Sequence, residues 1–346
     1  MPAAAQACRD WNSPLIECAS SQLVASRLLR NKGLLPALRQ RQIGYGGFTV
    51  NDRALLTDPR NEYPAPPFPK QPQVTPGLAR NMNPVPDHGE ESYRGSGKLA
   101  ERKALVTGGD SGIGRAVAIA FAREGADVAI SYLAEEEADA KEVIDLIEGA
   151  GRKALALPGD IKEEAWCRGL VDKAVSAMGR LDLLVINAGR QQYRKSIDEL
   201  TTDDFDKTMK TNLYALHWIA QAAAPHLPAG ASIITTASIQ AYEPSAILLD
   251  YATTKAGIVA YTKALAKQLI KRGIRANVVA PGPVWTVLQP SGGQPDDKVE
   301  HFGQDSDFGR PGQPVELAPV YVLLASQEAS FINGEVYGVT GGKGVA

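Results

Sequence analysis

Short apolar runs alternate with amphipathic segments from residue 98 to the end of the chain. The runs are four to six residues long and largely apolar, as expected for strands that are buried on both faces. Apolar residues recur every three or four positions in several segments between them, which predicts helices. The predicted strands are 103–107, 127–131, 154–157, 181–186, 232–236, 276–280 and 336–339, and the predicted helices include 115–124, 136–148, 204–224 and 315–325.

This alternation predicts the fold class. Strands separated by helices favour βαβ units, and these build a parallel sheet. We therefore expect residues 98–346 to form one α/β domain, a Rossmann-type doubly wound parallel sheet of about seven strands with helices on both faces.

The segment before this domain has a different composition. Nine of the 23 prolines fall in residues 59–86. Proline lacks a backbone N–H and has a fixed φ, so this stretch favours neither a helix nor a central strand. We expect residues 46–97 to form an extended arm, and its aromatic residues Tyr63, Phe68 and Tyr93 indicate that it packs on a folded surface.

Residues 1–45 form a third region, with six basic residues against Asp10 and Glu17 and an apolar pattern between them. An arginine-rich, acid-poor amphipathic N-terminus is typical of an organelle transit peptide. The alternatives are a disordered arm or a start codon placed too far upstream. We expect a cytoplasmic protein, with a mitochondrial location as the alternative if this segment is a transit peptide.

Composition and charge narrow the possible functions. The formal net charge of -2 gives no reason to expect nucleic acid or an anionic membrane as a partner. No apolar run reaches the length of about 18 residues that predicts a membrane-spanning helix. The three cysteines lack the spacing of a disulfide framework or a zinc site, which suits a reducing compartment. The four histidines are scattered, so we expect no metal site.

A glycine-rich turn follows the first predicted strand, in the segment Thr107-Gly108-Gly109-Asp110-Ser111-Gly112-Ile113-Gly114-Arg115. Glycines permit a tight turn and a close approach of the backbone to a ligand, and the N-terminus of the next helix attracts anions. This is the dinucleotide position in a doubly wound sheet. The spacing differs from that of a P-loop NTPase. Residues 109–112 also match the surroundings of the nucleophile in trypsin-like serine proteases, but those are all-β proteins.

Tyr251 and Lys255 stand four residues apart near the start of a helix predicted to run to about residue 271, so they share one face. A free phenol has a pKa of about 10, and we expect the nearby ammonium of Lys255 to lower the pKa of Tyr251. Such a pair can move a proton to or from an alcohol or carbonyl oxygen. Alone, the spacing favours a solvated helix face. Ser238 changes this, because it follows a predicted strand at the sheet edge where ligands collect.

Together these residues resemble the short-chain dehydrogenase/reductase family. The resemblance rests on motifs in the family's order across residues 98–346, namely the glycine turn, Asn187-Ala188-Gly189, Asn212, Ser238, Tyr251, Lys255 and Pro281-Gly282. The arm, with Asp58-Pro59-Arg60, Pro66-Pro67-Phe68-Pro69 and Pro86-Asp87-His88-Gly89-Glu90, is similar to the N-terminal extension of a glucose/ribitol dehydrogenase-like subgroup.

The resemblance implies an NAD(P)-dependent oxidoreductase that interconverts a carbonyl (an aldehyde, ketone or sugar) and an alcohol by hydride transfer. It implies that Tyr251 is the general acid/base, that Ser238 polarises the carbonyl, that Lys255 assists the tyrosine and binds the nicotinamide ribose, and that Asn212 holds a water of the proton relay. The residues that it implies for dinucleotide binding are Gly108, Asp110, Ser111, Gly112, Ile113, Gly114, Tyr132, Asp160, Ile161, Asn187, Ala188, Gly189, Tyr251, Lys255, Pro281, Gly282, Val284 and Thr286.

The end of the second predicted strand bears on the choice of dinucleotide. Members of the family that prefer NAD usually carry an acidic residue about where Tyr132 stands. Its absence removes repulsion against the 2′-phosphate of NADP, although no arginine follows to bind that phosphate. NADP is therefore favoured, with NAD as the alternative.

The expected partners are a small carbonyl or alcohol substrate and further copies of the chain. The resemblance implies a mobile substrate lid over residues 285–309, in which Trp285, Leu288 and Phe302 would line an apolar pocket. It also implies a homotetramer that is formed by the helices near Asp204 and Tyr251. The competing function is a non-catalytic dinucleotide sensor on the same fold, which we expect to lack the tyrosine or the lysine.

Overall fold

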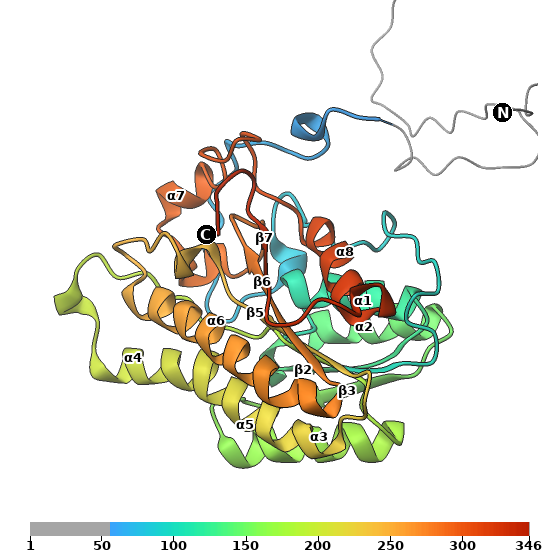
Figure 1. The fold of residues 1–346 in the computed structure, drawn as a ribbon. Coiled ribbons are helices and arrows are strands. Elements are labelled where there is room, and N and C mark those ends of the chain that lie inside the picture. The colour runs from blue at the N-terminus through green and yellow to red at the C-terminus, as the bar shows by residue number, and fades with distance from the viewer. Residues whose placement is uncertain (1–55, 346) are drawn as a thin grey trace, which may run out of the picture. The chain divides into compact units, whose positions relative to one another are not determined.

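A seven-stranded sheet is the centre of the structure, a computed structural model that describes residues 56–345 (Figure 1). All neighbouring strands are parallel, and their order across the sheet is β3-β2-β1-β4-β5-β6-β7. The prediction of a doubly wound parallel sheet is confirmed. The strands are β1 Lys103–Thr107, β2 Asp127–Tyr132, β3 Ala154–Pro158, β4 Leu183–Ile186, β5 Ser232–Thr236, β6 Arg275–Pro281 and β7 Val336–Val339.

The central strands are short and apolar because helices cover them on both sides. Every residue of β2, β4, β5 and β6 is buried, whereas the two edge strands β3 and β7 are largely accessible. Each fully buried valine, leucine or isoleucine stabilises the fold by about 1.5–3 kcal/mol. The buried central strands therefore stabilise the sheet, and the carboxyl edge of the sheet is a rigid base for the loops that follow the strands.

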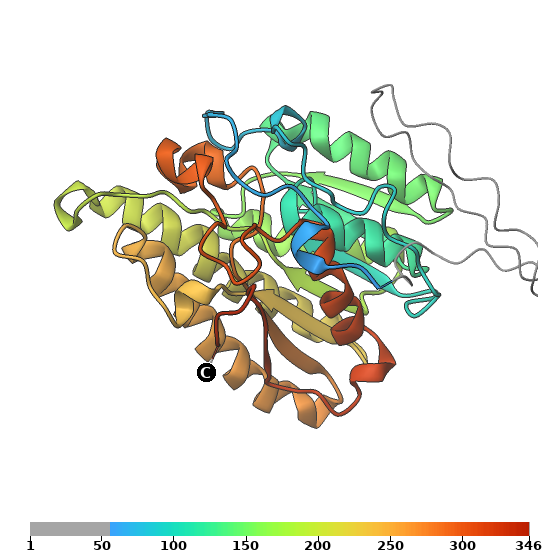
Figure 2. The ribbon, with the colours of Figure 1, turned by 90° about the horizontal axis from the view of Figure 1, so that it is seen from above.

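Two layers of helices enclose the sheet. Helices α1, α2 and α8 build one apolar core against it, and α3, α5 and α6 build the other, with α4 packed on α6 (Figures 1 and 2). The helices are α1 Gly112–Arg123, α2 Glu137–Gly149, α3 Glu164–Met178, α4 Thr202–Met209, α5 Ala215–Ala223, α6 Leu249–Leu269, α7 Asp296–Glu300 and α8 Pro314–Ala325.

One predicted helix is interrupted. The segment 204–224 was expected to be continuous, but a π-helical turn, Lys210–Tyr214, separates α4 from α5. The side chain of Asn212 explains the break, because it forms hydrogen bonds with the backbone of Arg190 instead of facing along the helix. Turns of this kind occur frequently at functional sites.

The proline-rich arm packs on the α/β domain, as its aromatic residues indicated. Phe68 and Tyr93 are buried. The rings of Phe68 and Trp285 have centroids 4.2 Å apart, and the indole Nε1 of Trp285 donates a hydrogen bond to the carbonyl oxygen of Pro84 (2.8 Å). The arm from Thr57 onward and the domain expected from residue 98 belong to one compact unit. The expectations for residues 1–45 concern a segment outside the described residues.

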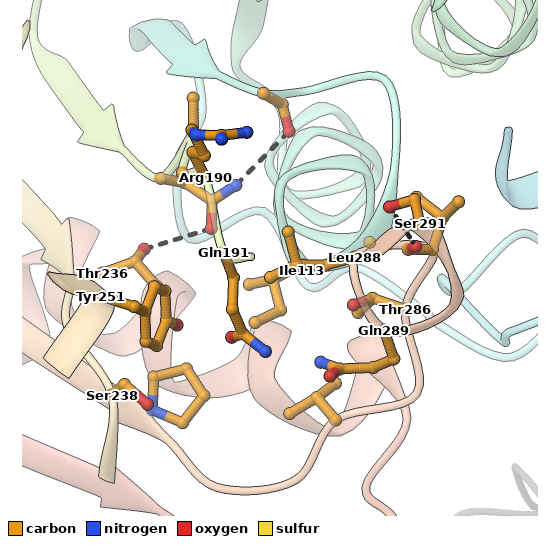
Figure 3. Close-up of a pocket in the computed structure, with 18 of the residues that line it drawn as sticks. Ile113, Arg190, Gln191, Thr236, Ser238, Tyr251, Thr286, Leu288, Gln289 and Ser291 are labelled. Atoms are coloured by element: carbon orange, nitrogen blue, oxygen red, sulfur yellow. Dashed lines mark hydrogen bonds between the residues drawn. The ribbon is translucent and has the colours of Figure 1, made fainter. Parts of the chain in front are cut away.

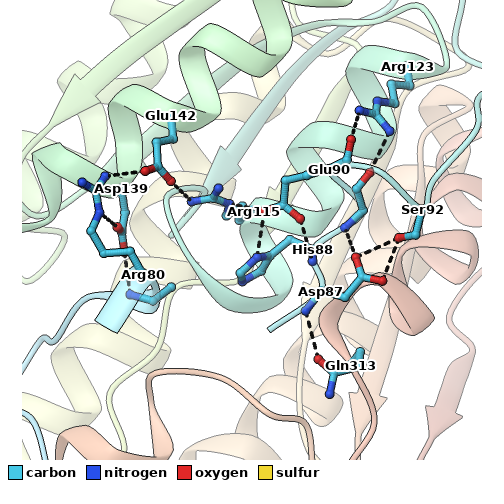
Figure 4. A network of polar contacts seen from close by, with 12 residues as sticks. Arg80, Asp87, His88, Glu90, Ser92, Arg115, Arg123, Asp139, Glu142 and Gln313 are labelled. Carbon is cyan, nitrogen blue, oxygen red and sulfur yellow. Dashed lines mark hydrogen bonds and ion pairs between the residues drawn. The ribbon is translucent and has the colours of Figure 1, made fainter. Parts of the chain in front are cut away.

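Ion pairs add to this apolar contact, as Figure 4 shows. Arg80 of the arm pairs with Asp139 of α2 (2.8 Å), and Arg115 of α1 pairs with Glu90 of the arm (3.0 Å). Asp139 and Arg115 are buried, so these pairs are far less screened than surface pairs. The arm is thereby held against the two helices that follow β1 and β2.

The described part of the chain bears on two other classes of protein, membrane proteins and metalloproteins. None of its helices combines the length and the apolar character needed to cross a membrane. Residues 56–345 also contain no group of three or more histidine, cysteine, aspartate or glutamate side chains arranged to hold a metal ion.

Candidate active site

A cavity of about 700 Å³ lies along the carboxyl edge of the sheet. Ligand pockets usually have volumes of roughly 300–1,000 Å³, and in doubly wound sheets they lie at this edge. Segments that follow each of the seven strands line the cavity, including the long loop after β6 and Lys343 after β7, as do two residues of the arm, Thr75 and Pro76. The sheet thus gathers side chains that are far apart in the sequence.

The glycine turn forms one end of the cavity. Gly108 and Gly112 have positive φ angles of 62° and 51°, which other residues adopt only with strain. A Cβ on Gly112 would lie 3.1 Å from Cγ2 of Thr286. Gly114 does not line the cavity, but a Cβ there would collide with the carbonyl oxygen of Gly108. Gly114 therefore permits the close packing of α1 on β1.

Asn187 and Thr236 connect the strands beneath this turn. The backbone N–H of Asn187 donates to Oγ1 of Thr107 (2.9 Å), and the hydroxyl of Thr236 donates to Oδ1 of Asn187 (3.2 Å). These bonds join the ends of β1, β4 and β5. Ala188 and Gly189 follow on the cavity wall, and Asp160 and Ile161 line it after β3.

Ser238, Tyr251 and Lys255 meet on the cavity wall, and all three are buried (Figure 3 labels the first two). Ser238 lies two residues beyond β5, and one face of α6 presents the tyrosine and the lysine. The Ser238 hydroxyl is near enough to the Tyr251 phenol to act on its pKa. The ammonium Nζ of Lys255 lies 5.2 Å from the centroid of the Tyr251 ring and donates to the carbonyl oxygen of Thr236 (2.8 Å).

Burial controls the electrostatics of these groups. It raises the pKa of Tyr251 to about 12, against the lowering effect of the nearby Ser238 hydroxyl. It lowers the pKa of Lys255 to about 7. The net shift of the Tyr251 pKa is therefore upward, opposite to the direction expected from the sequence. The physical reason is that burial disfavours the charged form of both groups, the phenolate and the ammonium.

Asn212 lies just behind the cavity and does not line it. Its amide group donates to the carbonyl oxygen of Arg190 (2.9 Å) and to Oγ1 of Thr254 (3.0 Å), and its Oδ1 accepts from the N–H of Arg190 (2.7 Å). A Cβ on Gly189 would lie 3.5 Å from Oδ1 of Asn212 and 3.6 Å from Nζ of Lys255. The asparagine therefore positions the loop after β4 next to the lysine.

Comparisons with known proteins place this arrangement in a family. A family model described as enoyl-(acyl carrier protein) reductase matches residues 108–343. A solved short-chain dehydrogenase from Burkholderia cenocepacia J2315, in complex with NADP, is 37% identical, with a TM-score of 0.66 over 71% of this chain and 98% of that one. The chain belongs to the short-chain dehydrogenase/reductase family.

Curated relatives within the short-chain dehydrogenase/reductases are more similar still. The uncharacterised oxidoreductase YghA of Escherichia coli (strain K12) is 58% identical over 288 residues, which are 83% of this chain and 98% of the relative. The glucose and ribitol dehydrogenase of Daucus carota is 41% identical over 281 residues, 80% of this chain and 96% of the relative. The resemblance inferred from the motifs is confirmed.

Two carboxyl groups lie on the wall of this dehydrogenase cavity: Asp110, which the resemblance had implied, and Glu136, which sequence reasoning missed. Asp110 is buried, and Glu136 accepts a hydrogen bond from the N–H of Leu133 (2.9 Å) beside Tyr132. Burial raises the pKa of Asp110 to about 6. Burial and the charge of Asp110 raise the pKa of Glu136 to about 8. Both residues were visible in the sequence, but only the fold shows that Glu136, four residues beyond Tyr132, turns back to the cavity.

The loop after β6 also differs from the sequence-based expectation. Leu288 and Phe302 line the cavity, but Trp285 does not. Its side chain is 0% exposed and packs between Phe68 of the arm and Phe302. The expectation that Trp285 lines the substrate pocket is wrong, because the arm covers the indole. Gln191 and Gln289, which were not singled out from the sequence, line the cavity instead.

Proposed function

We propose that this short-chain dehydrogenase/reductase interconverts a carbonyl and an alcohol with NADP or NAD. The observation that carries the proposal is the meeting of Ser238, Tyr251 and Lys255 on one wall of a cavity that begins at the glycine turn. A buried phenol beside a hydroxyl and an amine is suited to proton transfer with an oxygen atom, and no bond-forming nucleophile is required.

The residues at the glycine turn fit a dinucleotide. The N-terminus of α1 offers backbone N–H groups to a pyrophosphate, and the positive φ angles of Gly108 and Gly112 keep side chains out of its way. Thr286 lies directly over Gly112 and would hold the pyrophosphate or the carboxamide. A nicotinamide dinucleotide, when bound, supplies or accepts the hydride of the reaction.

The proton moves through the buried side chains of the protein. With a pKa of about 12, Tyr251 is protonated at neutral pH, so it donates a proton to the substrate oxygen in the reducing direction. Ser238 donates a hydrogen bond to the same oxygen and polarises the carbonyl. Lys255, with a pKa of about 7, exchanges protons readily near neutrality, so it is suited to restore the proton of the tyrosine.

Two features of the cavity act in opposite directions on the choice between NADP and NAD. No acidic side chain stands at Tyr132, and the Burkholderia relative was solved with NADP, both of which support NADP. Asp110 and Glu136 lie on the cavity wall and repel a 2′-phosphate when they are ionised. Initial rates with NADPH and NADH at equal concentrations decide between the two.

The homotetramer and the cytoplasmic location belong to the same proposal. Tyr214, 45% exposed, and Trp218, His217 and Tyr261 border an apolar hollow on α5 and α6. An exposed apolar surface of this kind suits an interface between identical subunits. Light scattering measures the mass in solution, and a monomer would contradict the assembly. Relatives in Escherichia coli and Bacillus subtilis, which have no mitochondria, support the location.

The direct test of the function is turnover. The purified full chain is mixed with NADPH or NADH and with aliphatic aldehydes, ketones and hydroxylated aldehydes, and the loss of nicotinamide absorbance is followed. Because the name of the carrot relative refers to glucose and ribitol, sugars and polyols are included. We expect oxidation of the dinucleotide with at least one carbonyl. A binding protein would shift its melting temperature with the dinucleotide and consume none.

A further inference from the structure

Three side chains of the cavity wall have a buried polar atom without a hydrogen-bond partner within residues 56–345, namely Asp110, Arg190 and Gln289, and only Gln289 has no ionisable group. Gln289, at the start of the turn Gln289–Gly293, is 7% exposed and lines the cavity. Its Oε1 is buried and has no hydrogen-bond partner within residues 56–345. Leaving such an atom unsatisfied costs about 1–3 kcal/mol. A ligand that brings a hydrogen-bonding group to this position removes that cost.

A second carboxamide connects Gln289 with the catalytic side chains. Gln191 is buried, and its Nε2 donates to the carbonyl oxygen of Gly293 (2.8 Å), in the same turn as Gln289. In Figure 3 the carboxamide of Gln191 lies between the phenol of Tyr251 and the carboxamide of Gln289. The two glutamines therefore extend the polar wall from Tyr251 towards the loop after β6.

The turn that carries Gln289 is held in place before any ligand arrives. Nε2 of Gln192 donates to the carbonyl oxygen of Ser291 (3.1 Å), and the hydroxyl of Thr75 in the arm donates to the same oxygen (2.5 Å). The hydroxyl of Ser291 donates to the carbonyl oxygen of Val287 (2.8 Å). These three hydrogen bonds fix the backbone of the turn. Gln289 is therefore preorganised for one position of a ligand group.

The chemistry of the two glutamines indicates the kind of group that they bind. A carboxamide offers two donors and one acceptor oxygen and has no charge. A hydroxyl both donates and accepts, so it satisfies the carboxamide of Gln289 in either orientation of the amide. A carboxylate is bound most strongly by a cation, whereas the two carboxamides carry no charge.

We propose that Gln289, together with Gln191, binds hydroxyl groups on the carbons next to the reacting carbon. The substrates are then hydroxylated aldehydes or ketones and, in the oxidising direction, polyols, while Leu288 and Phe302 contact the carbon chain. This inference rests on the proposed carbonyl–alcohol function and names its substrate class. Gln289 is a specificity-determining residue in it, and the proton transfer stays with Tyr251.

A matched pair of aldehydes tests the inference. Glyceraldehyde and propanal have the same carbon chain and differ by two hydroxyl groups. For the unaltered protein we expect kcat/KM to be at least tenfold higher with glyceraldehyde. Gln289→Leu should lower kcat/KM for glyceraldehyde by about 10- to 100-fold, the loss that corresponds to one buried hydrogen bond of about 1.4–2.7 kcal/mol. The value for propanal should change less than threefold.

Gln304→Leu is the matched control, because Gln304 belongs to the same loop but is exposed and lies outside the cavity lining. It should leave both aldehydes unchanged. A second measurement needs no turnover. With the oxidised dinucleotide present, a pentitol should raise the melting temperature of the unaltered protein and of Gln304→Leu, and this increase should disappear in Gln289→Leu.

The outcomes separate the two proposals. Turnover of propanal as efficient as that of glyceraldehyde by the unaltered protein overturns the inference and leaves the dehydrogenase function intact. Equal losses for both aldehydes in Gln289→Leu also overturn it, since they show a structural role only. No turnover of either aldehyde, of any other carbonyl or of any polyol overturns the proposed function and the inference together.

Discussion

The cavity has two walls that are built in different ways. The sheet wall consists of segments that leave the carboxyl ends of the strands, and it carries Ser238, Tyr251 and Lys255. The opposite wall, called the arm wall below, combines the loop after β6 with the arm, and it carries Gln289 and Thr75. The sheet wall is positioned by a core in which most residues are fully buried, whereas the arm wall depends on contacts between segments more than 200 residues apart. The proposed proton transfer therefore lies on the rigid wall, and the proposed substrate recognition lies on the wall that tertiary contacts assemble.

The largest effect is expected on the sheet wall. Tyr251→Phe removes the proton donor but keeps the ring, so kcat should fall by about 10²- to 10⁴-fold. The affinity for the dinucleotide, measured by fluorescence titration, should change only a few-fold. Tyr261→Phe is the control, because Tyr261 lies on the same helix and its hydroxyl bonds with His217 outside the cavity. Retention of most activity in Tyr251→Phe would contradict the assignment.

The second prediction concerns the apolar contact between Phe68 and Trp285, which holds the arm against the loop after β6. Phe68→Ala leaves a void against Trp285, and large-to-small changes of this kind cost about 3–5 kcal/mol of unfolding free energy. For a domain of this size the melting temperature should fall by roughly 10 °C. Phe331→Ala is the control, because that ring is 103% exposed and its loss should cost less than about 0.5 kcal/mol. Equal melting temperatures for the two variants would show that the arm contributes nothing to stability.

The polar side of the arm contact gives a smaller, pH-dependent effect. Burial alone would raise the pKa of Glu90, but the hydrogen bond and charge of His88 and the charge of Arg115 lower it to about 2. A carboxyl whose pKa is depressed in the folded state stabilises above its ordinary pKa, and this stabilisation is lost as the pH falls towards 2. Glu90→Gln should therefore lower the unfolding free energy by about 1–3 kcal/mol at pH 7.

Urea unfolding of Glu90→Gln at several pH values measures this. The difference from the unaltered protein should shrink as the pH falls from 5 to about 3. The exposed neighbour Glu91 gives the control Glu91→Gln, which should differ little from the unaltered protein at any pH. A difference for Glu90→Gln that does not depend on pH would show a packing effect instead of an ionic one.

The smallest expected effect concerns the preference for NADPH over NADH, which should depend on the charge of Glu136 on the sheet wall. The pKa of Glu136 is raised to about 8, so the carboxyl is largely neutral at pH 7 and charged at pH 9. Its charge repels the 2′-phosphate, so the ratio of kcat/KM for NADPH to that for NADH should fall about tenfold between these values. A change of about tenfold is the order of magnitude expected for the repulsion between two unit charges roughly 10 Å apart at an effective dielectric constant of about 20. Glu136→Gln should flatten the profile, and Glu135→Gln, at an exposed position, should not. A ratio that is independent of pH would place Glu136 away from the phosphate.

Much of the fold could be predicted because its signals are local. An apolar run such as Ser232–Thr236 is a buried strand wherever it stands, and the predicted bounds of this strand agree with the structure. The glycines of the turn after β1 and the pair Tyr251 and Lys255 are likewise local patterns, since backbone conformation and helical spacing act over a few residues.

The remaining features depended on distant parts of the chain. The role of Trp285 was misread because its cover, Phe68, lies in the arm. Glu136 and Gln289 showed no special pattern in the sequence, since exposure, partners and cavity contact are properties of the folded chain. The direction of the pKa shift of Tyr251 was misjudged for the same reason, because the desolvation that dominates it depends on everything packed around the phenol.

The sequence by itself determined the parallel sheet, the glycine turn, and the residues from which the catalytic wall is made. These follow from short-range rules of backbone conformation and from the burial of apolar runs. Only the tertiary structure decided that two residues of the arm line the cavity, that Glu136 adds a carboxyl group to its wall, and that Gln289 has a buried oxygen without a partner. Burial and hydrogen bonding depend on atoms brought together from the whole chain, and for this reason no single stretch of it reveals them.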